Sequence, residues 1–193
     1  MMPEDQLSAF SPHEVRSLLA YLASPAQTPL LATEETAKAF FNKKDLTYWR
    51  GDPALWSVEK DEIVGRTKGI PHNAFLVSDL ALEDFHLTLE VRLVKNEGNS
   101  GIQFRSRALP NGEMHGYQAD AGAGWWGKLY EENGRALLWD KSGEKHVKLD
   151  EWNKYEVIAA GSKIRTLING QLCVDLDDPP GARRGVTALQ LHS

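Results

Sequence analysis

The chain has 193 residues, of which 41% are hydrophobic and 25% are charged, a composition ordinary for a globular protein. Its net charge of −5 gives no basic footprint for nucleic acid, and no apolar run approaches the length that spans a bilayer. A single cysteine, Cys173, excludes an internal disulfide and a cysteine-rich metal site.

Residues 1–24 are expected to hold one short helix. Ser11 can cap its beginning with Pro12 at the first helical position. The apolar positions at helical spacing are Val15, Leu18, Leu19 and Leu22. One helix cannot bury such a stripe alone, so we expect it to dock on the main domain or on a part of the protein outside this chain. Residues 25–37, rich in proline, are expected to be a linker.

From residue 38 onward the pattern indicates β-strands. Apolar and polar residues alternate at 85–93, 102–105, 117–120, 163–175 and 189–192. Asn99 to Gly101 is expected to be a turn, and Asn169-Gly170 predicts a hairpin turn. Many short strands joined by Gly, Asn and Pro turns predict an all-β sandwich or barrel of antiparallel strands.

The two ends of the chain lead to expectations about a signal peptide and about the last strand. Met1 to Asp5 is acidic and no apolar segment with a cleavage site follows, so the sequence contains no predicted signal peptide. At the other end, the chain stops two residues beyond the apolar Leu191. An open apolar edge is a liability, so we expect the sandwich to lack its last strand.

The polar positions of the strands are unusual, because solvated strands mostly carry Thr, Lys, Glu and Ser. The outward positions here are Glu90, Arg92, Gln103, Arg105, Gln118, Asp120, Gln190 and His192. A sugar hydroxyl donates and accepts hydrogen bonds, and such side chains suit it. The alternative is an ordinary wet face with cross-strand ion pairs.

Two adjacent tryptophans, Trp125 and Trp126, lie between glycines. Aromatic planes stack on the C–H faces of sugar rings, whereas the alternative for at least one of the pair is a place in the core. Lys128 and Tyr130 follow at alternating positions and are expected on one strand face, with Glu131 or Glu132 beyond.

The candidates for acid–base chemistry are His192, Asp120, Glu131, Lys128 and Tyr130. Asp120 and Glu131 could perform ordinary glycoside hydrolysis at the required separation. His192 titrates near neutral pH, although a lone histidine is more often structural. The other histidines lack metal-ligand spacing, so a zinc site is not indicated.

Several motifs resemble the 3-keto-disaccharide hydrolase family, also called 3-keto-glucoside 1,2-lyase/2-hydroxyglucal hydratase. They are NSGIQFRSR (99–107), GYQAD (116–120), WGKLYE (126–131) and LQLHS (189–193), with supporting segments at 40–49, 56–59 and 63–65. The resemblance covers about residues 38–193 and implies a concanavalin A-like jelly roll. The family continues into a further strand after the last motif, which fits the expected truncation.

The resemblance implies cleavage of 3-keto-glycosides by β-elimination and hydration. The implied roles are His192 or Asp120 as base, Arg105 and Lys128 as enolate stabilisers, and Tyr130 or Glu131 as leaving-group acid. Gln103, Gln118, Gln190 and Trp126 would position the sugar ring. A divalent metal could replace the cationic stabilisers.

Residues 1–24 also resemble the C-terminal end of a class I cytochrome c, with Met2-Pro3 before the helix. No Cys-x-x-Cys-His occurs, so haem would belong to a domain upstream of this chain. The resemblance implies export to the periplasm or the cell exterior, with a signal peptide upstream. A plain docking helix is the alternative.

Three other functions remain open. A non-catalytic carbohydrate-binding module would use the same face without proton transfer. A retaining or inverting glycosidase is weaker, because the Glu-x-Asp-x-x-Glu motif of jelly-roll glucanases is missing from the sequence. A structural or adhesive role is the third. The expected partner is an oligosaccharide or glycoside.

Overall fold

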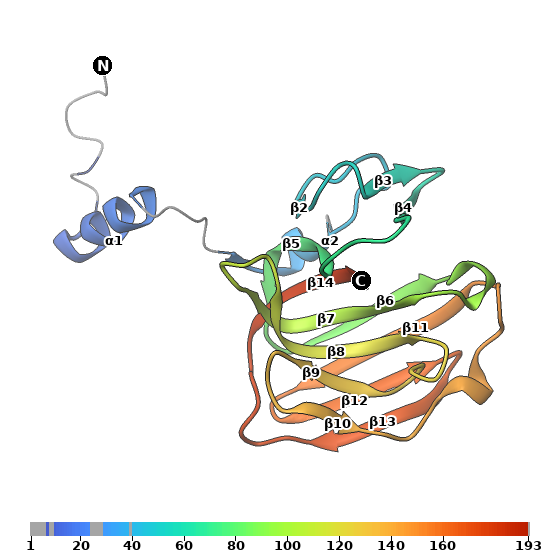
Figure 1. Ribbon diagram of the computed structural model, residues 1–193. Coiled ribbons are helices and arrows are strands. Elements are labelled where there is room, and N and C mark those ends of the chain that lie inside the picture. The colour runs from blue at the N-terminus through green and yellow to red at the C-terminus, as the bar shows by residue number, and fades with distance from the viewer. Residues whose placement is uncertain (1–6, 8–9, 24–28, 39, 193) are drawn as a thin grey trace.

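The computed structural model describes residues 7, 10–23, 29–38 and 40–192 (Figure 1). Its large sheet contains β1 (Leu30–Leu31), β2 (Trp49–Arg50), β5 (Ala74–Leu82), β7 (Asn99–Ala108), β8 (Met114–Gly122), β9 (Leu129–Glu132), β10 (Ala136–Trp139) and β14 (Gly185–Leu191). The small sheet contains β6 (Phe85–Val91), β11 (Asn153–Ala160), β12 (Lys163–Ile168) and β13 (Gln171–Asp177). A separate ribbon contains β3 (Trp56–Glu59) and β4 (Glu62–Gly65).

The two sheets stack as an all-β jelly-roll sandwich, as predicted (Figure 1). The order in the large sheet is β1-β5-β14-β7-β8-β9-β10, with β2 also paired to β5. The order in the small sheet is β13-β12-β11-β6. All these pairs are antiparallel except that of β1 with β5.

The core lies between the sheets because alternate residues of each strand point inward. Its buried members include Ile102, Phe104, Tyr117, Ala119, Trp126, Leu129, Tyr155, Val157, Ile164, Ile168 and Val174. Phe104 stacks on Tyr117 with ring centroids 5.3 Å apart. A second cluster, formed by Trp49, Trp56 and Leu76, connects the β3–β4 ribbon to the large sheet.

The helix near the N-terminus is confirmed as α1 (Pro12–Leu22). Ser11 Oγ accepts from the backbone N–H of Glu14, whose carboxylate accepts from the N–H of Ser11, a capping box. Leu18, Leu19 and Leu22 are exposed, so no described residue covers this stripe. The Met2-Pro3 motif lies outside the described residues. Within the described part, no helix has the length and apolarity to cross a membrane.

Three expectations about the strands differ from the structure. Asn99 to Gly101 is not a turn but the first part of β7, because cross-strand pairing with β8 overrides the turn preference of these residues. The chain reverses instead around a short 3₁₀ helix, Val94–Asn96, where Lys95 and Asn96 have left-handed φ values of 56° and 51°.

The second difference concerns β14, the strand before His192, which is not an edge strand. β14 lies between β5 and β7, so no open apolar edge exists at this strand. The segment expected to be a linker, residues 25–37, contains β1 and most of α2 (Glu34–Lys38). The Asn169-Gly170 hairpin is confirmed between β12 and β13, with φ values of 51° and 77°. A further 3₁₀ helix is Glu144–His146.

Candidate functional site

The large sheet carries a row of polar side chains on the side that faces away from the sandwich core. The register places Gln103 opposite Gln118, and Gln118 opposite Tyr130. We call the outward residues Ser106, Gln103, Gln118, Asp120, Gln190 and Tyr130 the polar face. Their neighbours along the strands, such as Ile102 and Ala119, belong to the core.

The amides of the polar face form one continuous hydrogen-bond chain. Ser106 Oγ donates to Gln103 Oε1 at 2.7 Å, and Gln103 Nε2 donates to Gln118 Oε1 at 2.8 Å. Gln118 Nε2 then donates to Asp120 Oδ1 at 2.9 Å and to Gln190 Oε1 at 3.1 Å. The chain therefore joins side chains from β7, β8 and β14.

A glycine makes the last of these contacts possible. Gln118 is on β8 and Gln190 is on β14, and β7 runs between them. A Cβ atom on Gly101 of β7 would lie 2.5 Å from Cγ and Cδ of Gln118. The missing side chain at Gly101 thus lets Gln118 reach across β7 to Gln190.

Three buried polar atoms near this glycine have no hydrogen-bond partner among the described residues: Asp120 Oδ2, Gln190 Nε2 and Asn99 Oδ1. Buried polar groups are normally paired, so such atoms require an explanation. The two acceptors and one donor come from three neighbouring strands. Asp120 and Gln190 are only 2% and 1% exposed, so these atoms lack a described partner inside the protein and not at an open surface.

Asp120 can exchange a proton at neutral pH. Its burial raises the pKa of the carboxyl group to about 7, and the charge of Glu132 also raises it, while the hydrogen bond from Gln118 and the charge of Lys128 lower it. From inside the core, Tyr155 Oη donates to the backbone carbonyl of Asp120 at 3.2 Å. This hydrogen bond ties the backbone at Asp120 to the core.

An aromatic side chain stands beside the polar face, but it is Trp125 and not Trp126. Trp126 is 1% exposed, belongs to the core and donates its Nε1 proton to Asn96 Oδ1 at 2.9 Å. Its ring packs among the core side chains and not on the polar face, which corrects the expectation for this residue. Trp125 is 36% exposed, and its ring centroid lies 6.3 Å from that of Tyr130 and 5.2 Å from Lys128 Nζ.

Tyr130 lies on the outward face of β9, and Lys128 immediately precedes β9, two residues before it and beside Asp120, as the alternation predicted. Lys128 Nζ also forms an ion pair with Asp140 Oδ1 at 2.7 Å. Glu132 belongs to this face as well, and its burial raises the pKa of its carboxyl group.

Glu131 points to the opposite side of β9, toward Arg135. Arg135 donates to the Glu131 carboxylate from its backbone N–H and from its side chain at 2.6–2.9 Å. These hydrogen bonds lower the pKa of Glu131. Arg135 also bonds to Asp178, which accepts from the hydroxyl group of Tyr117. The structure therefore does not bring Glu131 together with Asp120.

Arg105 is likewise directed away from the polar face. Its side chain is fully buried and donates to the carbonyl oxygens of Glu83 and Gly161 at 2.8 and 2.7 Å and to Asp84 at 2.8 Å. Arg105 has a left-handed φ of 47° at a bulge of β7. It connects strand ends from both sheets, and these contacts engage the N–H donors of its guanidinium group.

His192 is exposed and follows β14, two residues beyond Gln190. The two-residue spacing from Gln190 places it on the same side of the sheet as the polar face, and its positive charge lowers the pKa of Glu132. In the part of the chain that the structure describes, no group of three or more His, Cys, Asp or Glu side chains is placed to hold a metal ion.

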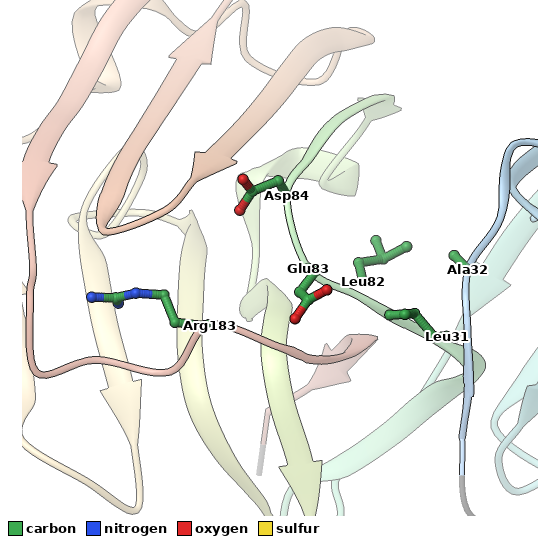
Figure 2. Close-up of a pocket in the computed structure, with 6 residues that line it drawn as sticks. All are labelled: Leu31, Ala32, Leu82, Glu83, Asp84 and Arg183. Atoms are coloured by element: carbon green, nitrogen blue, oxygen red, sulfur yellow. The ribbon is translucent and has the colours of Figure 1, made fainter.

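A pocket of about 470 Å³ is lined by Glu83 and Asp84, the partners of Arg105, and by no residue of the polar face (Figure 2). Its lining consists of Leu31, Ala32, Leu82, Glu83, Asp84 and Arg183. The Arg183 guanidinium donates to the backbone carbonyls of Asp178, Pro179 and Gly181. None of the site residues expected from the sequence lines this pocket.

Sequence reasoning missed Ser106 and Asn99. It named the pairs Trp125–Trp126 and Glu131–Glu132 but assigned the roles to Trp126 and Glu131. The period of two from Lys128 and Tyr130 points to Glu132 rather than Glu131, so that signal was present. The choice between two adjacent tryptophans depends on the loop conformation and leaves no signal in the sequence.

Comparisons with known proteins agree with the fold. Residues 36–193 match the family model described as 3-keto-alpha-glucoside-1,2-lyase-like domain. No curated protein matches the chain significantly.

Similar solved structures include a candidate glycosyl hydrolase from Parabacteroides distasonis, with a TM-score of 0.62 and 17% identity over 84% of this chain and 92% of that one. The carbohydrate-binding module CBM66 from Bacillus subtilis has a TM-score of 0.58 and 18% identity over 75% and 88%. A Bacillus subtilis protein of unknown function with a galectin-like fold has a TM-score of 0.52 and 11% identity over 86% and 88%.

Proposed function

The chain belongs, over residues 36–193, to the family of 3-keto-alpha-glucoside-1,2-lyase-like domains, and from this premise we propose that it cleaves 3-keto-glycosides by β-elimination. The ketone at C3 of such a sugar acidifies the proton on C2. A base removes this proton, the C–H electron pair forms the C1–C2 double bond, and the C1–O bond breaks toward the aglycone oxygen. Water then adds across the double bond and gives the free 3-keto-sugar, with no change of oxidation state.

The observation that carries the proposal is the buried pair of Asp120 Oδ2 and Gln190 Nε2, which have no partner among the described residues. Both side chains are bonded to the same nitrogen of Gln118, so the two groups are neighbours. An acceptor beside a donor matches the H–C2–C3=O unit of the substrate. Asp120 is the base, and Gln190 donates to the oxygen that becomes the enolate.

The pKa of about 7 supports Asp120 in this role, since the carboxylate accepts a proton efficiently when its pKa is close to the working pH. His192 is the alternative base. Arg105 and Glu131 have no part in this scheme, because their polar atoms are bonded within the protein.

Tyr130 is the leaving-group acid in this scheme. It lies directly opposite Gln118 on the polar face, and its hydroxyl group can donate to the aglycone oxygen. Trp125, whose ring packs edge-on near that of Tyr130, offers a plane for the sugar ring. Lys128, near Trp125, adds positive charge where the leaving oxygen becomes negative.

A non-catalytic carbohydrate-binding module is the second candidate. The exposed Trp125 and the unpartnered donor and acceptors favour it too, because they bind a hydroxyl group without moving a proton. Such a module binds the unoxidised glycoside, and it leaves the 3-keto-glycoside intact.

One experiment separates these functions. The protein is incubated with a methyl 3-keto-α-glucoside that carries deuterium at C2, with the unoxidised glycoside in parallel, and the products are followed by NMR. Elimination releases methanol from the 3-keto compound alone and transfers the deuterium to water. Free 3-keto-glucose labelled at C2 controls for spontaneous exchange. Methanol release with the label retained would contradict elimination, and binding without turnover would identify a module.

A further inference from the structure

The orientation of each amide in the polar face is set by its neighbour. An amide has an oxygen and a nitrogen end of almost equal shape, so its hydrogen-bond partners decide which way it points. Gln103 uses its oxygen for Ser106 and therefore presents its nitrogen to Gln118. Gln118 uses its oxygen for Gln103 and presents its nitrogen to Asp120 and Gln190.

We propose that Ser106 and Gln103 are positioning residues that hold the amide of Gln118 in this orientation and, through it, fix the groups that Asp120 and Gln190 offer to a substrate. The amide oxygen of Gln190 accepts from Gln118, so its nitrogen remains without a described partner. Oδ1 of Asp120 also accepts from Gln118, so Oδ2 remains without a described partner. The use of these two atoms in elimination rests on the proposed function, whereas their orientation does not.

A backbone irregularity brings Ser106 to this position. The pairing of β7 with β8 shifts register between Phe104 and Arg107, and Arg105 has a φ of 47°. The shift puts Ser106 on the same face as Gln103, where it is 2% exposed. The carbonyl oxygens of Phe104 and Tyr117 also lie 3.0 and 3.3 Å from Ser106 Oγ and compete for its single proton. Gln103 Oε1 is the nearest of the three acceptors at 2.7 Å, so the serine hydroxyl donates to it at the start of the chain.

A reversed chain would be unfavourable. It would set Gln118 Oε1 against the Asp120 carboxyl group, which can donate to that oxygen only when it is protonated; the ionised form required of a base would face a second acceptor. Gln190 would then turn its nitrogen toward Gln118 and its oxygen toward the substrate. An oxygen at that place repels a carbonyl oxygen, so the reversed chain cannot stabilise an enolate.

The variant Gln103→Glu tests this, because a carboxylate of the same shape only accepts. It draws the nitrogen of Gln118 toward position 103 and turns the oxygen of Gln118 toward Asp120. We expect the pKa of Asp120 to rise by about one unit or more and turnover at neutral pH to fall at least about tenfold. The pKa is measured by ¹³C NMR of the Asp120 carboxyl carbon, and the amide contacts of Gln118 and Gln190 by ¹⁵N-edited NMR.

Gln171→Glu is the matched control, since Gln171 is exposed on β13 and the chemical change is the same. Lys128, Glu132 and Tyr155, which act on Asp120 in the wild-type protein, are unchanged in both variants. The ionised carboxylate introduced at position 103 also raises the pKa of Asp120 by its own charge, so the reversal of the amide contacts is the deciding measurement. Ser106→Ala is the second variant, for the case that Gln103→Glu does not fold. It removes the donor that starts the chain, and we expect mixed orientations of the Gln118 and Gln190 amides.

Unchanged amide contacts of Gln118 and Gln190 in the folded variants would overturn the proposal, even where turnover falls or the pKa of Asp120 changes. A changed pKa and reversed amides support it, whether or not the wild-type protein turns over a 3-keto-glycoside. If the amides reverse but the wild-type protein does not turn over a 3-keto-glycoside, the positioning role stands and the proposed function fails.

Discussion

The side chain of Gln118 occupies the space that a side chain on Gly101 would fill. Gly101 lies opposite Asp120 in the register of β7 and β8, so this space adjoins the proposed base. Only a residue without a Cβ atom lets the hydrogen-bond chain cross β7.

Gly101→Ala is therefore expected to break the chain while the sandwich still folds. The new Cβ displaces Gln118, a side chain and not backbone, and separates it from Gln190. Aglycone release should fall at least about tenfold, because the donor to the enolate loses its orientation. Product NMR measures the loss, and circular dichroism checks the fold. Wild-type turnover in this variant would show that the Gln118–Gln190 contact is dispensable.

Asp120→Asn should lower aglycone release by about 10²- to 10⁴-fold, the usual contribution of a general base. The asparagine keeps an acceptor for Gln118 but cannot take a proton at neutral pH. Asp175→Asn is the matched control, since Asp175 forms an exposed ion pair with Arg165. If Asp120→Asn keeps full activity and His192→Ala loses it, His192 is the base instead.

The pH dependence follows from the raised pKa of Asp120, about 7. The base must be ionised, so the rate should rise with pH and level off above about pH 7 to 8. A rate–pH profile checks this, and Asp120→Asn should remove the step. A rate that falls as pH increases through 7 would contradict a carboxylate base.

Stability should change with pH in the opposite sense to activity. The folded protein holds the Asp120 proton more tightly than the unfolded chain, whose aspartates titrate near pH 3.9. The stabilisation is full below about pH 4 and is lost as pH rises through about 7. Asp120→Asn should therefore raise the melting temperature more at pH 8 than at pH 5. Equal shifts at both pH values would argue against a buried charge.

Trp125→Ala should raise KM about tenfold, which corresponds to about 1.4 kcal/mol of lost binding free energy. Trp125 is 36% exposed, so the fold should survive its removal. Trp152, 39% exposed and packed against Arg92, is the control for loss of an exposed tryptophan. Equal effects of both substitutions would show that Trp125 does not contact the sugar.

Arg105→Lys should act on stability rather than on catalysis. A lysine cannot replace the contacts of the guanidinium to Glu83, Gly161 and Asp84, and we expect a loss of about 3 kcal/mol in the free energy of unfolding. Arg165→Lys, at an exposed ion pair, should cost less than about 1 kcal/mol. Chemical denaturation measures both. A stable Arg105→Lys variant without turnover would return Arg105 to the list of catalytic candidates.

Strand alternation and the Asn169-Gly170 turn were enough to predict the sandwich, because both are local signals in the sequence. The same alternation predicted that Gln103, Gln118, Asp120 and Gln190 point outward from the core. The register of β7 with β8 and with β14 confirms that they share one face of the large sheet. The turn expected at Asn99 was wrong because pairing with a neighbouring strand overrode local preference.

The direction in which the Arg105 side chain points could not be predicted from the sequence. A bulge changes which way the residue points, and a bulge is visible only once two strands are paired. The pairing of β14 with both β5 and β7 likewise depends on contacts that are distant along the chain.

The place of β14 bears on how the molecule assembles. Leu189 pairs with Leu76 on one side and with Ile102 on the other, so the loops that these contacts close are long. Contacts between distant segments form slowly, and we expect insertion of β14 to limit the folding rate. Until that insertion, β5 and β7 expose unpaired edges to other chains, and Gln190 is not beside Asp120. Folding intermediates would then be inactive and prone to aggregate, and activity would return only with the slowest phase of refolding.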